Sequence, residues 1–137
     1  MPGILLVAHA PLASALRACV AHVHGAVPPR LEALDIEADL PAEAFAARAA
    51  AALARVTGDD GVLVLVDAAG ATPCNLARRL LHADGRVAVL AGVNLPMLLR
   101  AVCYRDEPLD RLAARALEGG QRGIGAMADD APETAAC

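Results

Sequence analysis

Hydrophobic positions along the chain fall into short continuous runs, separated by longer segments in which they recur every three or four residues. Two runs, GILLVAH at 3–9 and VLVLVD at 62–67, are almost uninterrupted. Such runs are typical of strands that are buried on both faces of a sheet. The run RVAVLAGV at 86–93 predicts another strand. The run LEALDIE at 31–37 alternates less cleanly, and it therefore predicts an outer strand.

The segments that follow these runs are predicted to be helical. Pro11 and Pro73 stand where a helix can begin, and Thr72 can N-cap the segment after it. Gly119 and Gly120 predict the end of the last helix. The expected helices cover 12–23, about 41–56, 74–83, 94–104 and 109–121.

This alternation of strands and helices predicts an α/β fold. Strands joined by helical crossovers form an open, mainly parallel sheet with helices on both faces. We expect four strands in the flavodoxin-like order 2-1-3-4. In such folds the working crevice lies outside the carboxyl ends of the strands, near the point where the strand order reverses.

Composition narrows the class of protein. The 137 residues fit one domain, and a hydrophobic content of 57% with only 1% aromatic residues predicts a core built from Ala, Val and Leu. The net charge is −4, and all twelve basic residues are arginine. A basic stripe interleaved with aromatic residues is missing, which argues against a nucleic-acid partner. The apolar runs are far shorter than the roughly 20 residues that span a bilayer, so we expect a cytoplasmic protein.

Two polar residues stand where neighbouring strands are predicted to end. His9 closes the first run and Asp67 closes the run at 62–67. If these strands are adjacent, the two side chains come within hydrogen-bond reach. A carboxylate on Nδ1–H of an imidazole leaves Nε2 facing outward as a nucleophile. Spacing alone also allows His9 to be a structural residue and Asp67 to cap the next helix.

The electrophile that fits this pair is a phosphoryl group. Helix N-termini after Ala10 and after Ala71 are expected to offer free N–H groups to it. The turn of Gly70, Ala71 and Thr72 adds backbone amides and one hydroxyl. We expect these three residues to bind the phosphoryl group.

The other candidate ligands do not predict a metal site. The cysteines lack C-x-x-C spacing. His22 and His24 are two residues apart near a helix end, and side chains at that spacing do not share a helix face. The chain is therefore expected to bind no metal.

Three blocks of sequence carry a resemblance to a known family. They are VAHAPLASAL at 7–16, GVLVLVDAAGATPCNLARRL at 61–80 and AGVNLPMLLRAV at 91–102. Over about residues 3–125 the chain resembles the IIA component of the mannose family of the phosphoenolpyruvate-dependent sugar phosphotransferase system. The third block is the most specific, because a generic α/β sheet does not require its NLPM.

The resemblance implies a function for the residues already singled out. His9 would be phosphorylated on Nε2 by the phosphocarrier HPr and pass the phosphoryl group to a IIB component, with Asp67 orienting it. The chain would be a phosphotransferase without a cofactor. Asn94, Pro96 and Met97 follow the carboxyl end of a predicted strand, so partner docking at the same crevice is expected there, although Pro96 equally suits simple helix initiation.

The resemblance also implies an assembly and a domain extent. We expect one IIA domain over 1–127, followed by a disordered tail over 128–137. The family implies a homodimer, sometimes completed by an exchanged C-terminal edge strand, for which GIGAM at 123–127 is the candidate.

The chain departs from the family pattern beside both residues of the pair. Ala10 follows His9 where members usually have glycine. The second motif usually runs Asp-Leu-Phe-Gly-Gly-Thr-Pro-Phe-Asn, and this chain has other residues at four of its positions, namely Ala68, Ala69, Ala71 and Cys74.

Three other functions fit parts of this pattern. A receiver domain accepting phosphate on Asp67 is disfavoured, because His9 replaces the acidic pair and the chain contains no lysine. A second alternative is the phosphotransferase subunit of a bacterial dihydroxyacetone kinase. A third is a non-transport regulatory protein whose affinity for a partner depends on phosphorylation.

Overall fold

The computed structural model describes residues 1–69 and 86–128. Within these residues it contains each strand and each helix that the hydrophobic pattern predicts. The predicted helix at 74–83 lies outside this part of the chain. The elements are β1 (Gly3–His9), α1 (Leu12–His24), β2 (Leu31–Ile36), α2 (Ala42–Val56), β3 (Val62–Val66), β4 (Val87–Ala91), α4 (Leu95–Cys103) and α5 (Leu109–Arg122).

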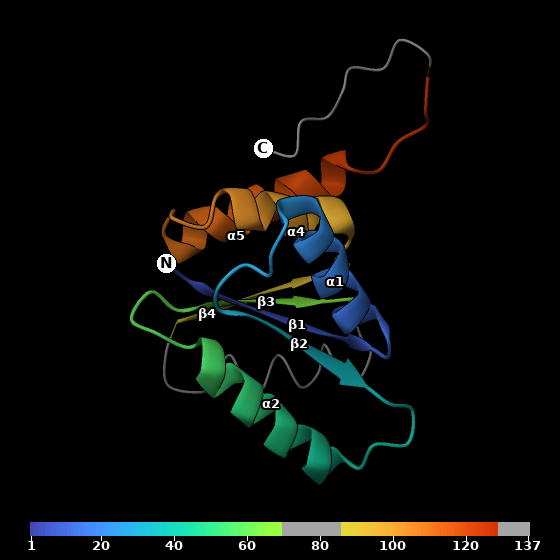
Figure 1. The fold of residues 1–137 in the computed structure, drawn as a ribbon, viewed down its shortest axis with the longest axis vertical. Coiled ribbons are helices and arrows are strands. Elements are labelled where there is room, and N and C mark those ends of the chain that lie inside the picture. The colour runs from blue at the N-terminus through green and yellow to red at the C-terminus, as the bar shows by residue number, and fades with distance from the viewer. Residues whose placement is uncertain (70–85, 129–137) are drawn as a thin grey trace.

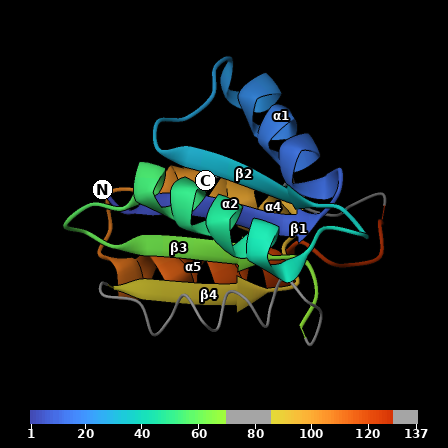
Figure 2. The same ribbon diagram turned by 90° about the horizontal axis from the view of Figure 1, so that it is seen from below.

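The four strands form one sheet in the order β2-β1-β3-β4, and every pairing is parallel. This confirms the flavodoxin-like order and the outer position of β2. Helices α1, α4 and α5 lie on one face of the sheet, and α2 lies on the other (Figures 1 and 2). Within the described residues, no helix is both long and apolar enough to cross a membrane.

The central strands β1 and β3 are buried because both faces of the sheet are covered. Alternate residues of each strand enter two separate hydrophobic clusters. Ile4 and Leu65 pack on the side of α1, α4 and α5. Leu5 and Val64 pack on the side of α2, against Phe45. This double burial explains why the two runs are continuously apolar rather than alternating.

Strand register brings the carboxyl ends of β1 and β3 to the same edge of the sheet. Val7 of β1 pairs with Val66 of β3, and His9 pairs with Ile36 of β2. Since Asp67 directly follows the paired Val66, His9 and Asp67 emerge together at this edge.

Helix α5 ends at Arg122, one residue beyond the predicted bound at 121, but the prediction that Gly119 and Gly120 end it is wrong. Helix α5 continues through both glycines, which are buried against α4. A Cβ atom on Gly119 would lie 2.6 Å from Cβ of Arg100, and one on Gly120 would lie 2.8 Å from Cε of Met97. The glycines therefore allow two helices to approach closely, which is a role that local sequence does not separate from C-capping.

The expected C-terminal edge strand at 123–127 does not form in this chain. Residues 124–128 have no regular secondary structure. This segment leaves the end of α5 and runs away from the sheet (Figure 1), with Ile124 and Met127 exposed. A strand needs a neighbouring edge for its hydrogen bonds, and within one chain the segment lies on the wrong side of α4 and α5 to reach one.

Candidate active site

His9 and Asp67 form a hydrogen-bonded pair at the carboxyl edge of the sheet. Nδ1 of His9 lies 2.8 Å from Oδ2 of Asp67, and the backbone N–H of His9 donates to the same oxygen at 3.0 Å. Oδ1 of Asp67 accepts from the backbone N–H of Ala68 at 2.9 Å. Both carboxylate oxygens are therefore held, and the carboxylate is fixed relative to the imidazole.

This geometry selects one tautomer of the imidazole. An ionised carboxylate can only accept hydrogen bonds, so Nδ1 of His9 carries the proton and Nε2 keeps its lone pair. The side chain of His9 is 56% exposed, whereas that of Asp67 is 12% exposed. Nε2 is thus on an accessible ring, whose other nitrogen is hydrogen-bonded to the largely buried carboxylate.

The pKa of Asp67 favours the ionised form. Burial raises the pKa of this carboxyl group, but hydrogen bonds from the His9 ring and backbone, together with the charge of the ring and the Ala68 N–H, outweigh it. The pKa of Asp67 therefore lies below its ordinary value, and the group is a carboxylate at neutral pH. Such a group stabilises the positive charge that develops on an imidazole whose Nε2 attacks an electrophile.

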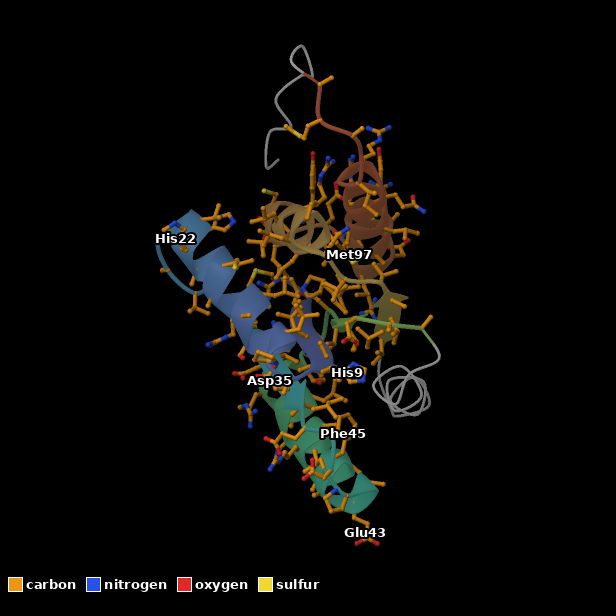
Figure 3. The ribbon with its side chains drawn as sticks, turned by 90° about the vertical axis from the view of Figure 1, so that its right-hand side faces the viewer. His9, His22, Asp35, Glu43, Phe45 and Met97 are labelled. Atoms are coloured by element: carbon orange, nitrogen blue, oxygen red, sulfur yellow. The ribbon has the colours of Figure 1, made fainter. Side chains whose placement is uncertain are left out.

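The N-terminus of α1 differs from the prediction. Pro11 supplies no side-chain cap, and a carboxylate from β2 takes that place. Oδ1 of Asp35 accepts from the backbone N–H of Ser14 at 3.0 Å, and Oδ2 accepts from the Ser14 hydroxyl at 2.5 Å. The expectation of free N–H groups after Ala10 is therefore wrong for Ser14. Asp35 and His9 lie at the same end of the sheet, where α1 begins (Figure 3).

Sequence reasoning missed Asp35. The available signal was a carboxylate near the end of an outer strand, LEALDI, whose register then places Asp35 beside Ala8 of β1. The other predicted phosphoryl-binding residues, Gly70, Ala71 and Thr72, lie outside the described residues and stay predictions.

The block containing Asn94, Pro96 and Met97 joins two helices. Oδ1 of Asn94 accepts from the backbone N–H of Met97 at 2.9 Å and so caps α4. Its Nδ2 donates to the carbonyl oxygen of Gly120 on α5 at 3.0 Å. Met97 is only 3% exposed, so the docking role expected for it is wrong, because its side chain fills the core beneath α4. Asn94 and Pro96 are half-buried.

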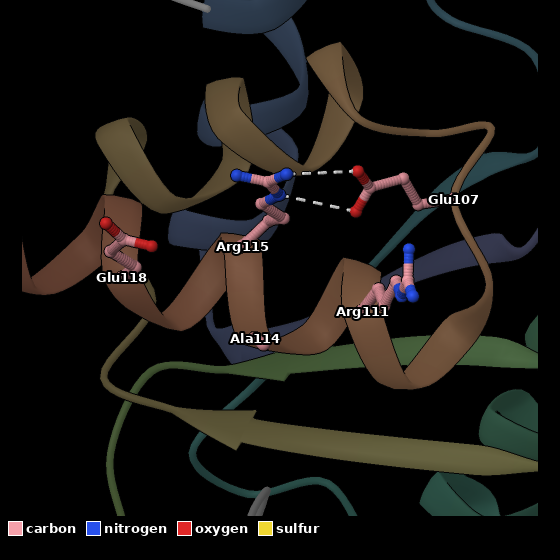
Figure 4. A pocket seen from close by; sticks show the side chains of 5 residues that line it. All are labelled: Glu107, Arg111, Ala114, Arg115 and Glu118. Carbon is pink, nitrogen blue, oxygen red and sulfur yellow. Dashed lines mark hydrogen bonds and ion pairs between the residues drawn. The ribbon is translucent and has the colours of Figure 1, made fainter.

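Within the described residues we find neither a metal-binding cluster nor a pocket that includes the His9–Asp67 pair. No group of three or more His, Cys, Asp or Glu side chains is placed to hold a metal ion in this part of the chain. A shallow pocket lies along α5 (Figure 4), with Glu107 accepting two hydrogen bonds from Arg115 at 3.3 Å each. Its lining does not include His9 or Asp67.

Curated relatives share part of this chain. It is 40% identical over 88 residues to the PTS system mannose-specific EIIAB component of Escherichia coli (strain K12), an alignment that covers 63% of this chain and 27% of that protein. It is 42% identical over 55 residues to the PTS system fructose-specific EIIA component of Bacillus subtilis (strain 168), covering 40% and 38% of the two chains. The aligned parts thus make up well under half the length of these relatives.

Solved structures match over nearly the whole chain. The mannose/sorbose specific IIA subunit of the phosphotransferase system from Enterococcus faecalis has a TM-score of 0.83 at 28% identity, covering 98% of each chain. The phosphotransferase system component EIIA from Streptococcus agalactiae has a TM-score of 0.82 at 25% identity, covering 92% of this chain and 97% of that one. The EIIA-man family model, described as PTS system fructose IIA component, matches residues 3–116. The chain therefore belongs to the EIIA-man family of phosphotransferase system IIA components.

Proposed function

We propose that this chain is a phosphocarrier in which Nε2 of His9 accepts a phosphoryl group from phosphorylated HPr and passes it to a IIB component. IIA components are phosphotransferases by family. The observation that carries the proposal is the 2.8 Å contact between Nδ1 of His9 and Oδ2 of Asp67. It presents Nε2 with a free lone pair on a side chain that a partner protein can reach.

The proposed transfer needs no cofactor, because each bond that forms is matched by one that breaks. Nε2 of His9 forms a bond to phosphorus while the nitrogen–phosphorus bond of the donor breaks, and the electron pair of that bond returns to the donor imidazole. The proton on Nδ1 stays in place, and Asp67 offsets the positive charge of the substituted ring. In the onward step His9 is the donor: the acceptor group of IIB forms a bond to phosphorus while the Nε2–phosphorus bond breaks, and its electron pair returns to the His9 ring. Such exchange depends on alignment and fixed charges, which the protein itself supplies.

The partners follow from the same role. The Escherichia coli relative is named an EIIAB component, and for this chain we propose a IIB component as the acceptor. With HPr proposed as the donor, we also propose a cytoplasmic location for this protein. We also propose a homodimer, in which the exposed segment around Ile124 and Met127 pairs with a second copy. Docking near His9 is left to residues other than Met97, including Asn94 and Pro96.

Phosphorylation with purified components tests the proposal. The chain is incubated with enzyme I, HPr and labelled phosphoenolpyruvate, and we expect one acid-labile phosphate on the wild type and none on His9→Ala. His22→Ala is the matched control, because His22 is an exposed histidine near the end of α1 farther from the site (Figure 3). Label mapped to His22, His24 or an aspartate would contradict the mechanism.

A further inference from the structure

His9, the last residue of β1, and Ala10, which follows it, are hydrogen-bonded to the chain on both sides of β1. The backbone N–H of His9 donates to Asp67, next to β3, at 3.0 Å. The backbone N–H of Ala10 donates to the carbonyl oxygen of Ile36 on β2 at 2.9 Å. Since only Ala10 and Pro11 separate His9 from α1, any movement of the helix start is passed directly to the histidine.

The start of α1 is itself held from β2 through Asp35. Its carboxylate accepts from the Ser14 backbone N–H at 3.0 Å and from the Ser14 hydroxyl at 2.5 Å. Strand β1 lies between β2 and β3. Each neighbouring strand therefore supplies one carboxylate to this loop: Asp67 holds the imidazole, and Asp35 holds the helix that follows.

The direction of the Asp35 side chain decides whether it contacts the His9 ring or only the start of α1. Side chains alternate between the faces of a strand. Leu31 of β2 packs in the cluster on the α1 side, and Asp35, four residues on, shares that face and bonds to α1. Its carboxylate is therefore engaged by Ser14, and it acts on the histidine through the backbone of the loop rather than by contact with the ring.

We propose that Asp35 is a positioning residue for phosphoryl transfer, which holds the first turn of α1 so that His9 keeps its alignment with Asp67. The proposal rests on the proposed function of His9. It also means that a phosphoryl group on Nε2 does not receive the Ser14 N–H, because that donor is already occupied. A displacement of about 1 Å at a reacting group can lower the rate about 100-fold. Loss of a helix cap that does not touch the reacting atoms can therefore slow transfer measurably.

Two substitutions at Asp35 test the proposal. Asp35→Ala removes both contacts to Ser14. Asp35→Asn removes the charge but keeps both contacts, because its amide oxygen accepts from the Ser14 N–H and its NH₂ donates to the Ser14 hydroxyl, whose proton turns to the Pro11 carbonyl oxygen 3.1 Å away. We expect Asp35→Ala to slow transfer from phosphorylated HPr at least about tenfold, mainly in kcat. We expect Asp35→Asn to restore the rate to within about threefold of the wild type.

A matched control and a second readout make the test specific. Thr57→Ala removes a helix-terminus hydrogen bond of 2.6 Å, to the carbonyl oxygen of Leu53, at the opposite edge of the sheet; transfer should be unchanged. Ring ¹⁵N shifts of His9 in the unphosphorylated protein report the Nδ1–H bond to Asp67 directly. We expect them to match the wild type in Asp35→Asn and Thr57→Ala, and to show a mixture of tautomers in Asp35→Ala.

The outcomes distinguish this inference from the proposed function. If Asp35→Ala transfers as fast as the wild type with unchanged ring shifts, Asp35 is not a positioning residue. If Asp35→Asn is as slow as Asp35→Ala, or if both are faster than the wild type, Asp35 acts through its charge and the inference is overturned. If Asp35→Ala does not fold, an Asp35→Asn rate well below that of the wild type still overturns the inference. If the wild type takes up no phosphate, the proposed function fails, while the ring shifts still test positioning.

Discussion

Replacing Asp67 by asparagine tests how the carboxylate contributes to the reactivity of His9. Oδ1 of Asp67 faces the Ala68 N–H at 2.9 Å, and Oδ2 faces two donors of His9, the ring Nδ1–H at 2.8 Å and the backbone N–H at 3.0 Å. An introduced amide must turn its NH₂ toward one of these sides. If the NH₂ faces Ala68, it meets one N–H donor with which it cannot form a hydrogen bond. If the NH₂ faces His9, it meets the backbone N–H of His9, and it can bond to the ring only if the ring proton moves from Nδ1 to Nε2. The first orientation costs less, so the tautomer survives in Asp67→Asn.

What Asp67→Asn loses is the negative charge. A hydrogen bond to a charged group contributes about 1.5–3 kcal/mol, compared with about 1 kcal/mol for a neutral one. The difference of about 0.5–2 kcal/mol corresponds to a rate about 2- to 30-fold lower, at 1.36 kcal/mol per factor of ten. Asp67→Ala removes the whole interaction, so its rate should fall about 10- to 150-fold.

Single-turnover transfer from phosphorylated HPr, quenched and counted as acid-labile phosphate, measures these rates, and ring ¹⁵N shifts of His9 give the tautomer. The expected order is wild type, then Asp67→Asn, then Asp67→Ala. If Asp67→Asn places the proton on Nε2, or is slower than Asp67→Ala, the orientation argument is refuted. If Asp67→Ala transfers at the wild-type rate, Asp67 has no part in the mechanism.

The structure makes two further predictions about stability. Gly120→Ala places a methyl group 2.8 Å from Cε of Met97 and 3.1 Å from its Cβ, and such overpacking should lower the free energy of unfolding by about 1–3 kcal/mol. Denaturant unfolding measures this, and an unchanged midpoint would show that α4 and α5 do not need the glycine. The lowered pKa of Asp67 predicts a pH dependence as well: its contribution is fully present above the unfolded-state pKa of about 3.9 and is lost as the pH falls through the folded-state pKa. The stability advantage of the wild type over Asp67→Asn should therefore shrink on acidification below about pH 4, and growth of that advantage would contradict the assigned direction.

Much of the functional site was predictable because its signals are local. An apolar run of strand length that ends in a polar residue marks a strand end, and the βαβ pattern brings the ends of parallel strands to one edge. His9 and Asp67 satisfy both conditions, and the register of β1 with β3 then places them in contact.

The errors arose where one residue type serves two purposes. A pair of glycines late in a helical pattern suits a C-cap, and it also suits a close helix contact. At Gly119 and Gly120 the contact with α4 decides, since the helix continues beyond both. Met97 follows a proline at a helix start, and only the packing of α4 shows that it points inward.

The sequence by itself determined the strands and helices of the described residues and the two strand-end residues on which the proposed function rests. These follow from patterns of a few residues, whose periodicity reflects local backbone geometry. Only the tertiary structure decided that Asp35 caps α1 from β2 and that Asn94 joins α4 to α5. Those contacts link residues 21 and 26 positions apart. They depend on how the elements pack against one another, and no local pattern encodes that packing.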